Sequence, residues 1–177
     1  MSTYTPIPLE LRTNRMLLTP EREDDASWLE RLFATRDAPP VDRAETLRRI
    51  RAMDELVARG IGARVLRPVD GSAALGYVAV VVGRASFDEP ELAWELLPEA
   101  RGQGYATEAA AVLRDAALAT GRRRLWATIR PDNRASRRVA EKIGLAVART
   151  SSDERGPVEW WSTSGDDPGF PPADVDR

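Results

Sequence analysis

Two spacings of apolar residues alternate along the chain, and each predicts a different kind of element. Short apolar runs predict seven strands, over residues 15–19, 61–66, 75–82, 92–97, 124–129, 145–150 and 158–162. Apolar residues three or four positions apart predict four helices, around residues 28–33 and over 46–58, 107–120 and 133–143. This order of elements predicts an α/β (α+β) domain with a mixed central sheet of about seven strands and helices on both faces.

The two ends of the chain differ in composition from its middle. Residues 1–12, where Pro6 and Pro8 break any early element, predict a flexible N-terminal segment. Residues 163–177 are rich in Gly, Pro and Asp and predict a disordered tail. The remaining residues, 13–162, suit one domain without internal repeats.

The composition narrows the chemistry that the chain can perform. Lys and Arg total 26 against 28 Asp and Glu, and this net charge of −2 predicts no nucleic-acid partner. The chain has no cysteine and no histidine, which excludes disulfides, zinc–thiolate sites, a cysteine nucleophile and a Ser-His-Asp triad. Any general base must therefore be a carboxylate, Tyr, Lys or a chain of waters. Since no long apolar run or signal-like N-terminus is visible, we expect a cytoplasmic protein without a membrane partner or a bound metal.

Residues 92–109 carry the strongest functional signal. They predict a short apolar strand, a turn containing Gly102 and Gly104, and an alanine-rich helix. Glycine allows the positive φ that turns successive N–H groups toward one point. The helix that follows adds its unpaired N–H groups and the positive end of its dipole. With Arg101 as a charged donor, the turn is typical of a site for phosphate or diphosphate.

Three kinds of phosphate-binding turn have distinct sequence requirements. A P-loop needs Lys-Ser/Thr after its last glycine, where this chain has Tyr105-Ala106, so that type is excluded. A dinucleotide-binding turn needs a third glycine at the position of Thr107, which leaves it a distant alternative. The pattern Arg/Gln-x-x-Gly-x-Gly/Ala is met by Arg101, Gly104 and Ala106. An ordinary strand-to-helix turn, in which the glycines supply only geometry, explains the same residues.

A second motif lies one strand and one helix further on. Residues 133–145 follow the pattern Asn-x-x-Ser-x-x-x-x-x-Lys-x-Gly-hydrophobic. Together with the pattern that begins at Arg101, this motif resembles the GNAT acetyltransferases. More narrowly, residues 105–109 (Tyr-Ala-Thr-Glu-Ala) and residues 13–20 resemble the RimJ/RimL-like branch that acetylates N-termini of ribosomal proteins. The resemblance covers about residues 13–162.

The resemblance implies a splayed sheet and a set of cofactor contacts. The central parallel strands, here 92–97 and 124–129, are expected to part at their carboxyl ends and admit acyl-CoA, as the general rule for open α/β sheets also suggests. A backbone N–H at the end of the first strand, that of Leu96 or Leu97, is expected to polarise the thioester carbonyl. The CoA contacts implied are Leu96, Leu97, Arg101, Gly102, Gln103, Gly104, Tyr105, Ala106, Thr107, Asn133, Arg134 and Ser136.

Asn133 and Ser136 lie three positions apart, on one face of the predicted helix. In the resembling enzymes the asparagine contacts the pantetheine arm, and the serine lies beside the sulfur as a proton donor. Asn133 also suits the N-cap of the helix. Many GNAT enzymes carry a tyrosine acid four residues before the glycine, and this chain has Ala140 there. Ser136 is therefore the remaining candidate acid.

Three carboxylates are candidate bases. Glu95 ranks first, acting through water, because a charged residue inside so apolar a strand suggests a cleft. Glu91 lies on the same face of the strand, but exposure at an edge is the simpler expectation for it. Glu159, in the last strand, is a third option.

These observations predict an acetyl-CoA-dependent N-acetyltransferase that acts on a primary amine of a small molecule or a protein N-terminus. The absence of cysteine favours direct transfer over a covalent acyl-enzyme. A CoA-binding or dimerising module without activity is the alternative, favoured by the missing tyrosine, and a homodimer is compatible with either hypothesis. A nucleotide-binding oxidoreductase is a third hypothesis.

Overall fold

The computed structural model describes residues 4–36 and 38–164. Within them one sheet has eight strands: β1 (Leu11–Arg12), β2 (Met16–Thr19), β3 (Gly62–Pro68), β4 (Gly76–Val81), β5 (Glu91–Leu96), β6 (Trp126–Ile129), β7 (Ala146–Asp153) and β8 (Gly156–Ser162). The α-helices of the same residues are α1 (Ala26–Phe33), α2 (Arg43–Ala58), α3 (Tyr105–Ala119) and α4 (Arg134–Lys142). Two short 3₁₀ turns, η1 (Glu23–Asp25) and η2 (Pro98–Ala100), precede α1 and α3.

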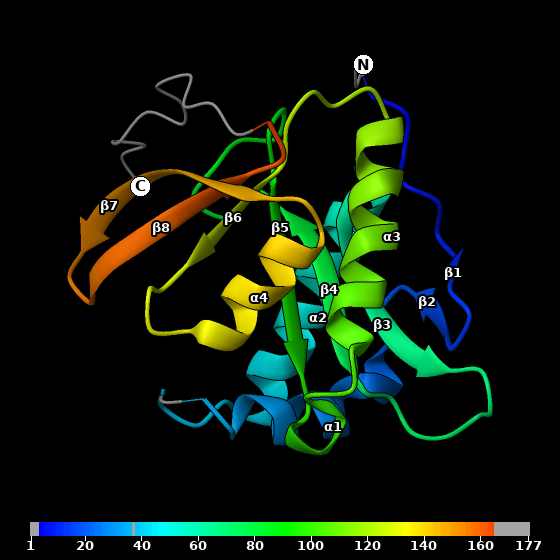
Figure 1. The fold of residues 1–177 in the computed structure, drawn as a ribbon. Helices are drawn as coiled ribbons and strands as arrows, with labels where there is room; N and C mark the ends of the chain where they lie inside the picture. The colour runs from blue at the N-terminus through cyan, green and yellow to red at the C-terminus, as the bar shows by residue number, and fades with distance from the viewer. Residues whose placement is uncertain (1–3, 37, 165–177) are drawn as a thin grey trace.

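The strands lie in the order β1-β2-β3-β4-β5-β6-β8-β7 (Figure 1). Among the described strands, β5 and β6 form the one parallel pair, and the other neighbours are antiparallel. The predicted mixed sheet is therefore confirmed. The short strand β1, which pairs with β2, brings the predicted number of about seven strands to eight.

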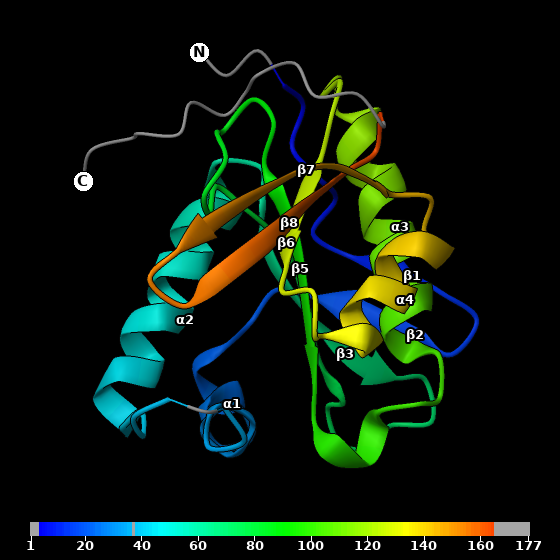
Figure 2. The same cartoon turned by 60° about the vertical axis from the view of Figure 1, so that its left-hand side comes forward.

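Helices cover both faces of the sheet, as predicted (Figure 2). One apolar core lies between the sheet and the pair α3 and α4, and it includes Leu113 and Ala140. The other lies between the sheet and the pair α1 and α2, and it includes Leu29 and Ile50. Because each helix buries one apolar stripe, the central strands are shielded from water on both sides, whereas each residue of β7 is at least partly exposed.

Local sequence explains where the helices begin. The Asp42 carboxylate caps α2 by accepting a hydrogen bond from the Glu45 N–H at 2.7 Å. The helix therefore begins at Arg43, three residues before the predicted start at residue 46. Helix α3 begins at Tyr105, directly after Gly104, whose φ of 82° no other residue type adopts easily. The cap of α4 is Asn133, as predicted.

The segment from residue 4 onward, for which the sequence predicted flexibility, packs against the rest of the described chain. Ile7 is 2% exposed, and its N–H donates to the Gly60 oxygen at 3.0 Å. The buried Arg64 donates through Nη2 to the Pro8 oxygen at 3.1 Å. The segment is thus held by a buried apolar side chain and a buried guanidinium, and neither contact is visible in the local sequence.

Of the expected C-terminal tail, the structure describes Thr163 and Ser164. The Thr163 N–H donates to the Leu125 oxygen at 3.1 Å, beside the start of β6. The rest of the predicted tail lies outside the described residues.

The two parallel strands separate soon after they meet. Their shared register consists of Glu91 opposite Trp126, where the Trp126 N–H donates to the Pro90 oxygen at 2.9 Å. Among the described residues, no later position of β5 pairs with β6, and the two arrows diverge in Figure 1. The expected splayed pair is therefore present.

Candidate functional site

The turn between β5 and α3 presents a row of free N–H groups. Gly102 and Gly104 have φ values of 77° and 82°, as their positions in the motif predicted. The Glu108 N–H donates to the Gly104 oxygen at 3.0 Å, which is the first hydrogen bond of α3. Within the described chain, no N–H from residue 102 to residue 107 has an acceptor. Six adjacent donors at the positive end of a helix dipole form a cradle for an anion.

The glycines of this turn face open space. A Cβ at Gly102 would meet no atom within 4 Å, and one at Gly104 would approach Arg15 Nη2 no closer than 3.6 Å. The protein itself therefore does not exclude a side chain at either position. The requirement for glycine comes from the positive φ and from keeping the space before the N–H groups clear.

Arg101 does not point into this cradle. Its Nε donates to the Leu96 oxygen at 3.0 Å, and its Nη2 lies 3.5 Å from Thr35 Oγ1. The Arg101 N–H donates to the Pro98 oxygen at 3.2 Å. The guanidinium satisfies the last carbonyl of β5, which needs another donor because β5 loses its neighbour β6 at this end. A contact between Arg101 and phosphate stays a prediction.

The backbone N–H groups of Leu96 and Leu97, at the end of β5, point in different directions. The Leu97 N–H donates to the Leu75 oxygen at 2.9 Å, so it is not free to polarise a thioester. Successive N–H groups of a strand point to opposite edges, so the Leu96 N–H points away from β4, toward the side that β6 has left. Of the two leucines named as candidates, Leu96 therefore has the N–H that is not bonded to β4, and its role toward a thioester stays a prediction.

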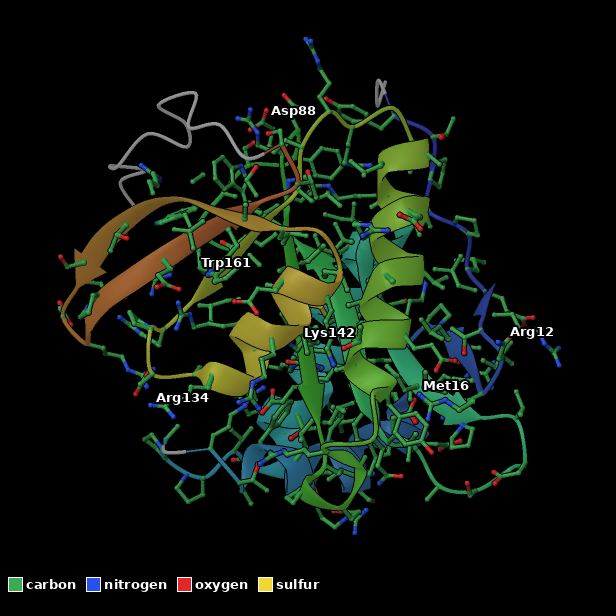
Figure 3. The ribbon with its side chains drawn as sticks, viewed as in Figure 1. Arg12, Met16, Asp88, Arg134, Lys142 and Trp161 are labelled. Atoms are coloured by element: carbon green, nitrogen blue, oxygen red, sulfur yellow. The ribbon has the colours of Figure 1, made fainter. Side chains whose placement is uncertain are left out.

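Helix α4 carries the second motif beside this opening. The Asn133 Oδ1 accepts the Ser136 N–H at 3.0 Å, which satisfies one free donor of the helix. Ser136 is half-buried, and Arg134 is exposed without an ion pair among the described residues. Figure 3 shows Arg134 at the start of the helix, with Lys142 at its other end. Ala140, four residues before Gly144, is fully buried and forms part of the core.

Glu95 is held by two residues that the sequence did not indicate. Its Oε1 accepts from Arg36 Nε at 2.9 Å, Arg36 Nη2 contacts Oε2, and the Tyr77 hydroxyl donates to Oε2 at 3.1 Å. Arg36 lies just after α1, 59 residues from Glu95, so no local pattern could pair them. The guanidinium also stacks on the Phe33 ring, 4.2 Å from its centroid. The first-ranked base is therefore a charge-balanced carboxylate on the sheet face that α1 and α2 cover.

Glu91 is buried, contrary to the expectation of edge exposure. It is 7% exposed and accepts hydrogen bonds from Thr128 Oγ1 at 2.8 Å and from the Arg84 N–H. Burial raises the pKa of the Glu91 carboxyl, although these hydrogen bonds oppose the shift. The side chain bridges β5 and β6 at the point where the strands begin to part.

Glu159 lies on the opposite face of the sheet, beside α4. Its Oε2 is 3.1 Å from Arg137 Nε and accepts from Trp161 Nε1 at 3.1 Å. The three candidate bases therefore do not converge on one point, since Glu91 and Glu95 project toward α1 and α2.

Asp153 links the turn between β7 and β8 to two neighbouring segments. Its carboxylate accepts two hydrogen bonds from Arg130 Nη2 at 2.8 Å and one from Arg84 Nη2 at 2.5 Å. These bonds hold the pKa of the Asp153 carboxyl well below its ordinary value. The end of β6, the segment after β4 and the β7–β8 turn are thus joined around one carboxylate.

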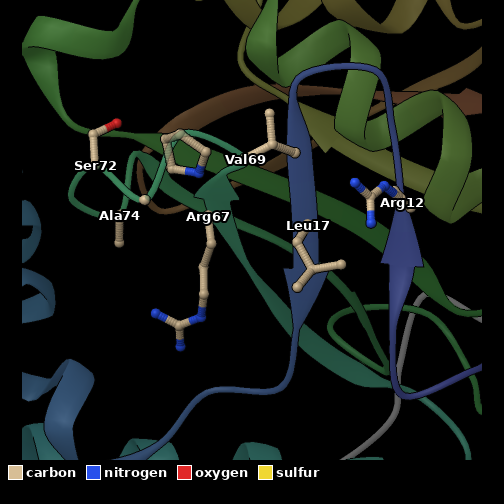
Figure 4. A pocket seen from close by; sticks show the side chains of 8 residues that line it. Arg12, Leu17, Arg67, Val69, Ser72 and Ala74 are labelled. Carbon is tan, nitrogen blue, oxygen red and sulfur yellow. The ribbon is translucent and has the colours of Figure 1, made fainter.

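Two cavities on the surface of the described residues lie outside the glycine turn. The larger of the two, about 470 Å³, opens beside β2 and the turn that links β3 to β4, and its lining includes Arg12, Leu17 and Arg67 (Figure 4). Arg67 is already bound to Asp25 Oδ2 at 2.8 Å. A smaller cavity of about 300 Å³ lies between Arg130 and Arg155, before α4.

Neither a metal site nor a membrane span is found in the described residues. No cluster of three or more carboxylates in residues 4–36 and 38–164 is arranged to hold a metal ion. None of the helices seen there combines the length and the apolar character needed to cross a bilayer.

Comparisons with known proteins agree with this geometry. The domain model for "Acetyltransferase (GNAT) domain" matches residues 15–146. An acetyltransferase from Agrobacterium tumefaciens is 27% identical with a TM-score of 0.74, and covers 92% of this chain and 97% of its own. A protein described as a GNAT-family acetyltransferase from Bordetella pertussis is 22% identical with a TM-score of 0.76, covering 88% and 99%.

A third similar structure contains CoA. It is RimL, a ribosomal L7/L12 alpha-N-protein acetyltransferase in complex with CoA, which is 18% identical with a TM-score of 0.72 and covers 88% of this chain and 96% of its own. A search of the curated proteins found no match. The family model spans most of the chain and includes both the glycine turn and α4, so the chain belongs to the GNAT acetyltransferase domain family.

Proposed function

We propose that this protein is an acetyl-CoA-dependent N-acetyltransferase that passes the acetyl group directly to a primary amine. One observation carries the proposal: six unpaired N–H groups lie beside the end of β5, where the parallel pair has parted. Such a cradle suits the diphosphate of CoA, and the opening between the strands suits its thioester arm. Bound acetyl-CoA would supply an activated acyl group on a thiol that leaves readily, since a thiol has a pKa of about 8.5.

The chain's own residues have distinct tasks in this proposal. The amides of residues 102–107 hold the diphosphate, and the Leu96 N–H donates to the thioester oxygen as negative charge develops on it. Such a donor contributes about 3 kcal/mol to transition-state stabilisation. Asn133 contacts the pantetheine arm, Arg134 meets a CoA phosphate, and the Ser136 hydroxyl lies beside the sulfur as proton donor.

The acceptor approaches from the face that α1 and α2 cover. Glu95 lies on this face, but its carboxylate is already paired with Arg36 and Tyr77. It therefore accepts the proton of the attacking amine through water, and the amine must reach the carbonyl in its neutral form. A protein N-terminus is one acceptor class, which the similarity to RimL supports. A small-molecule amine is the other.

Binding of CoA is the first test. Calorimetry should show that wild-type protein binds CoA and that Gly104→Val does not, because a branched side chain occupies the phosphate position and disfavours φ near 82°. Ala73→Val, in the exposed turn before β4, is the matched control. Equal affinity of Gly104→Val and wild type would overturn the cradle.

Turnover is the second test. Release of free thiol from acetyl-CoA should appear with at least one member of a panel of amines and short peptides, and mass spectrometry should find 42 Da added to that acceptor, as for any acetyl group. Thiol release that is independent of every acceptor would contradict transfer to an amine.

A CoA-binding or dimerising module without catalytic activity is the second candidate. The engagement of Glu95 by Arg36 and the core alanine at position 140 favour it. Tight binding of CoA without acceptor-dependent thiol release would support this function over the enzyme.

A further inference from the structure

Arg15 makes an unusual number of contacts for an exposed residue in a turn. Its Nε lies 2.7 Å from Glu108 Oε2, and its Nη2 lies 2.6 Å from the same oxygen. Its Nη1 donates to the Gln103 oxygen at 3.1 Å, and its Cζ lies 4.2 Å from the centroid of the Tyr105 ring. One side chain from the β1–β2 hairpin thus contacts three groups at the glycine turn and the start of α3: the Gln103 carbonyl, the Tyr105 ring and the Glu108 carboxylate.

The backbone of the hairpin reinforces this contact. The Arg15 N–H lies 3.3 Å from Glu108 Oε1, and Thr13 Oγ1 accepts from the N–H groups of Arg15 and Met16 at 3.2 and 2.9 Å. Arg15 and Glu108 are 93 residues apart in sequence. The β1–β2 hairpin and the start of α3 are therefore in direct contact, although they lie far apart in the sequence.

The glycine turn depends on such outside support. Its N–H groups from residue 102 to residue 107 have no acceptor in the described chain, so no internal ladder holds them. Apart from the contacts of Arg15, the turn is held by Gln103 Nε2, which donates to the Glu99 oxygen at 2.9 Å, and by the Glu108 N–H, which donates to the Gly104 oxygen at 3.0 Å. Two glycines with positive φ have wide conformational freedom, so ordering this turn around a ligand costs entropy unless the turn is fixed beforehand.

Charge gives the pair a second role. Glu108 is a carboxylate in the first turn of α3, next to the site of a diphosphate that carries negative charge itself. Partial burial acts to raise the pKa of Glu108, but hydrogen bonds from Thr13 and Arg15 lower it further, so the group stays ionised. Arg15 neutralises this carboxylate and removes its repulsion of an incoming diphosphate.

We propose that Arg15 and Glu108 form a brace that holds the diphosphate-binding turn in its binding conformation, and that Arg15 is a positioning residue for acyl-CoA. The inference rests on the proposed function, since it assumes that CoA occupies the turn. It adds that affinity for the diphosphate is set from the β1–β2 hairpin, by side chains that do not themselves touch the ligand.

The test separates the diphosphate from the rest of the substrate. The variants are Arg15→Gln, Glu108→Gln and their combination, with Arg51→Gln as control, because Arg51 forms a similar exposed pair with Glu23 at 3.1 Å on α2. Calorimetry gives the Kd for CoA. Steady-state assays give KM for acetyl-CoA and for S-acetylpantetheine, which lacks the diphosphate and the nucleotide.

We expect Arg15→Gln to raise the Kd for CoA and the KM for acetyl-CoA about tenfold, which corresponds to about 1.4 kcal/mol. The KM for S-acetylpantetheine should stay within about twofold of wild type, and the double variant should bind CoA no more weakly than Arg15→Gln. The thermal midpoint should change little, because exposed ion pairs add little stability.

Two outcomes overturn the brace. One is an unchanged Kd for CoA in Arg15→Gln, and the other is an equal loss for CoA and S-acetylpantetheine, which indicates a general effect on the fold. The proposed enzymatic function fails separately, when wild-type protein binds CoA but no acceptor produces thiol. In that case the Kd for CoA of Arg15→Gln, compared with that of wild type, still tests whether Arg15 and Glu108 form the brace.

Discussion

Thr128 on β6 donates a 2.8 Å hydrogen bond to the buried carboxylate of Glu91 on β5, at the position where the two parallel strands share their pairing. A side chain thereby bridges the strands just before they part. A charged group in this position is expensive to bury, and burial accordingly raises the pKa of Glu91. The opening of the sheet therefore begins at a carboxylate whose ionisation affects stability.

This relationship predicts a pH-dependent stability difference between wild type and Glu91→Gln. A raised pKa means that the folded state binds a proton more readily than the unfolded chain, so stability from protonation is fully present below the ordinary value of 4.5 and is lost as pH rises through the folded pKa. Glutamine keeps the shape without the charge. The free energy of unfolding of Glu91→Gln, taken relative to that of wild type, should therefore be higher at pH 8 than at pH 5, by on the order of 1 kcal/mol.

Urea unfolding at the two pH values measures this difference. Glu95→Gln, on the same strand but partly exposed, serves as the comparison. A constant difference between Glu91→Gln and wild type across this range would contradict the assignment of the shift to Glu91.

Arg101 should affect turnover more than CoA affinity. Its contact with the Leu96 oxygen orients the peptide group at the end of β5, and a misplaced donor to the thioester oxygen costs catalysis. Arg101→Lys retains the charge but not this geometry, so kcat should fall about tenfold while the Kd for CoA stays within about threefold. A second variant, Arg101→Gln, tests the alternative. If Arg101→Lys kept the wild-type kcat and Arg101→Gln weakened CoA binding, Arg101 would be a phosphate ligand.

Ser136→Ala should lower kcat by about tenfold to a hundredfold and leave the Kd for CoA nearly unchanged. The cap of α4 survives this change because Asn133 accepts the main-chain N–H of residue 136, not its hydroxyl. Single-turnover assays with acetyl-CoA measure the step directly. Ser152→Ala, on the exposed surface of β7, is the control. Turnover equal to wild type would remove Ser136 from the mechanism.

The N-terminal segment should contribute to global stability. Ile7 is 2% exposed in the core, so Ile7→Ala should lower the free energy of unfolding by about 2–4 kcal/mol. Leu9→Ala, two residues away and 62% exposed, should change it by less than about 0.5 kcal/mol. Denaturant unfolding distinguishes the two, and similar effects at both positions would mean that the segment is not packed as described.

The sequence predicted most of the fold because its signals are local. The apolar spacing located the helices and all strands except β1, and the glycines at 102 and 104 marked the turn with its positive φ values. Asn133 was predicted as a cap from its position before a helix, and it is one. Each of these inferences needs only residues within a few positions of one another.

Contacts between distant segments could not be predicted in the same way. The pairing of Arg36 with Glu95 joins residues 59 positions apart, and that of Arg15 with Glu108 joins residues 93 positions apart. Which leucine has a free N–H depends on the register of β5 against β4, which alternation alone does not fix. The roles of these charged groups therefore emerge only from the folded chain.

Arg101 also lies 3.5 Å from Thr35, one residue before the segment that leads to α2. The turn proposed to receive the acyl donor and the segment beside the proposed acceptor face are therefore in contact through one guanidinium. When acetyl-CoA occupies the glycine turn, Arg101 is held in place, and so is the segment beside Thr35 that Arg101 contacts. We expect steady-state kinetics to show ordered addition, in which the acyl donor enters before the amine and the free thiol departs last.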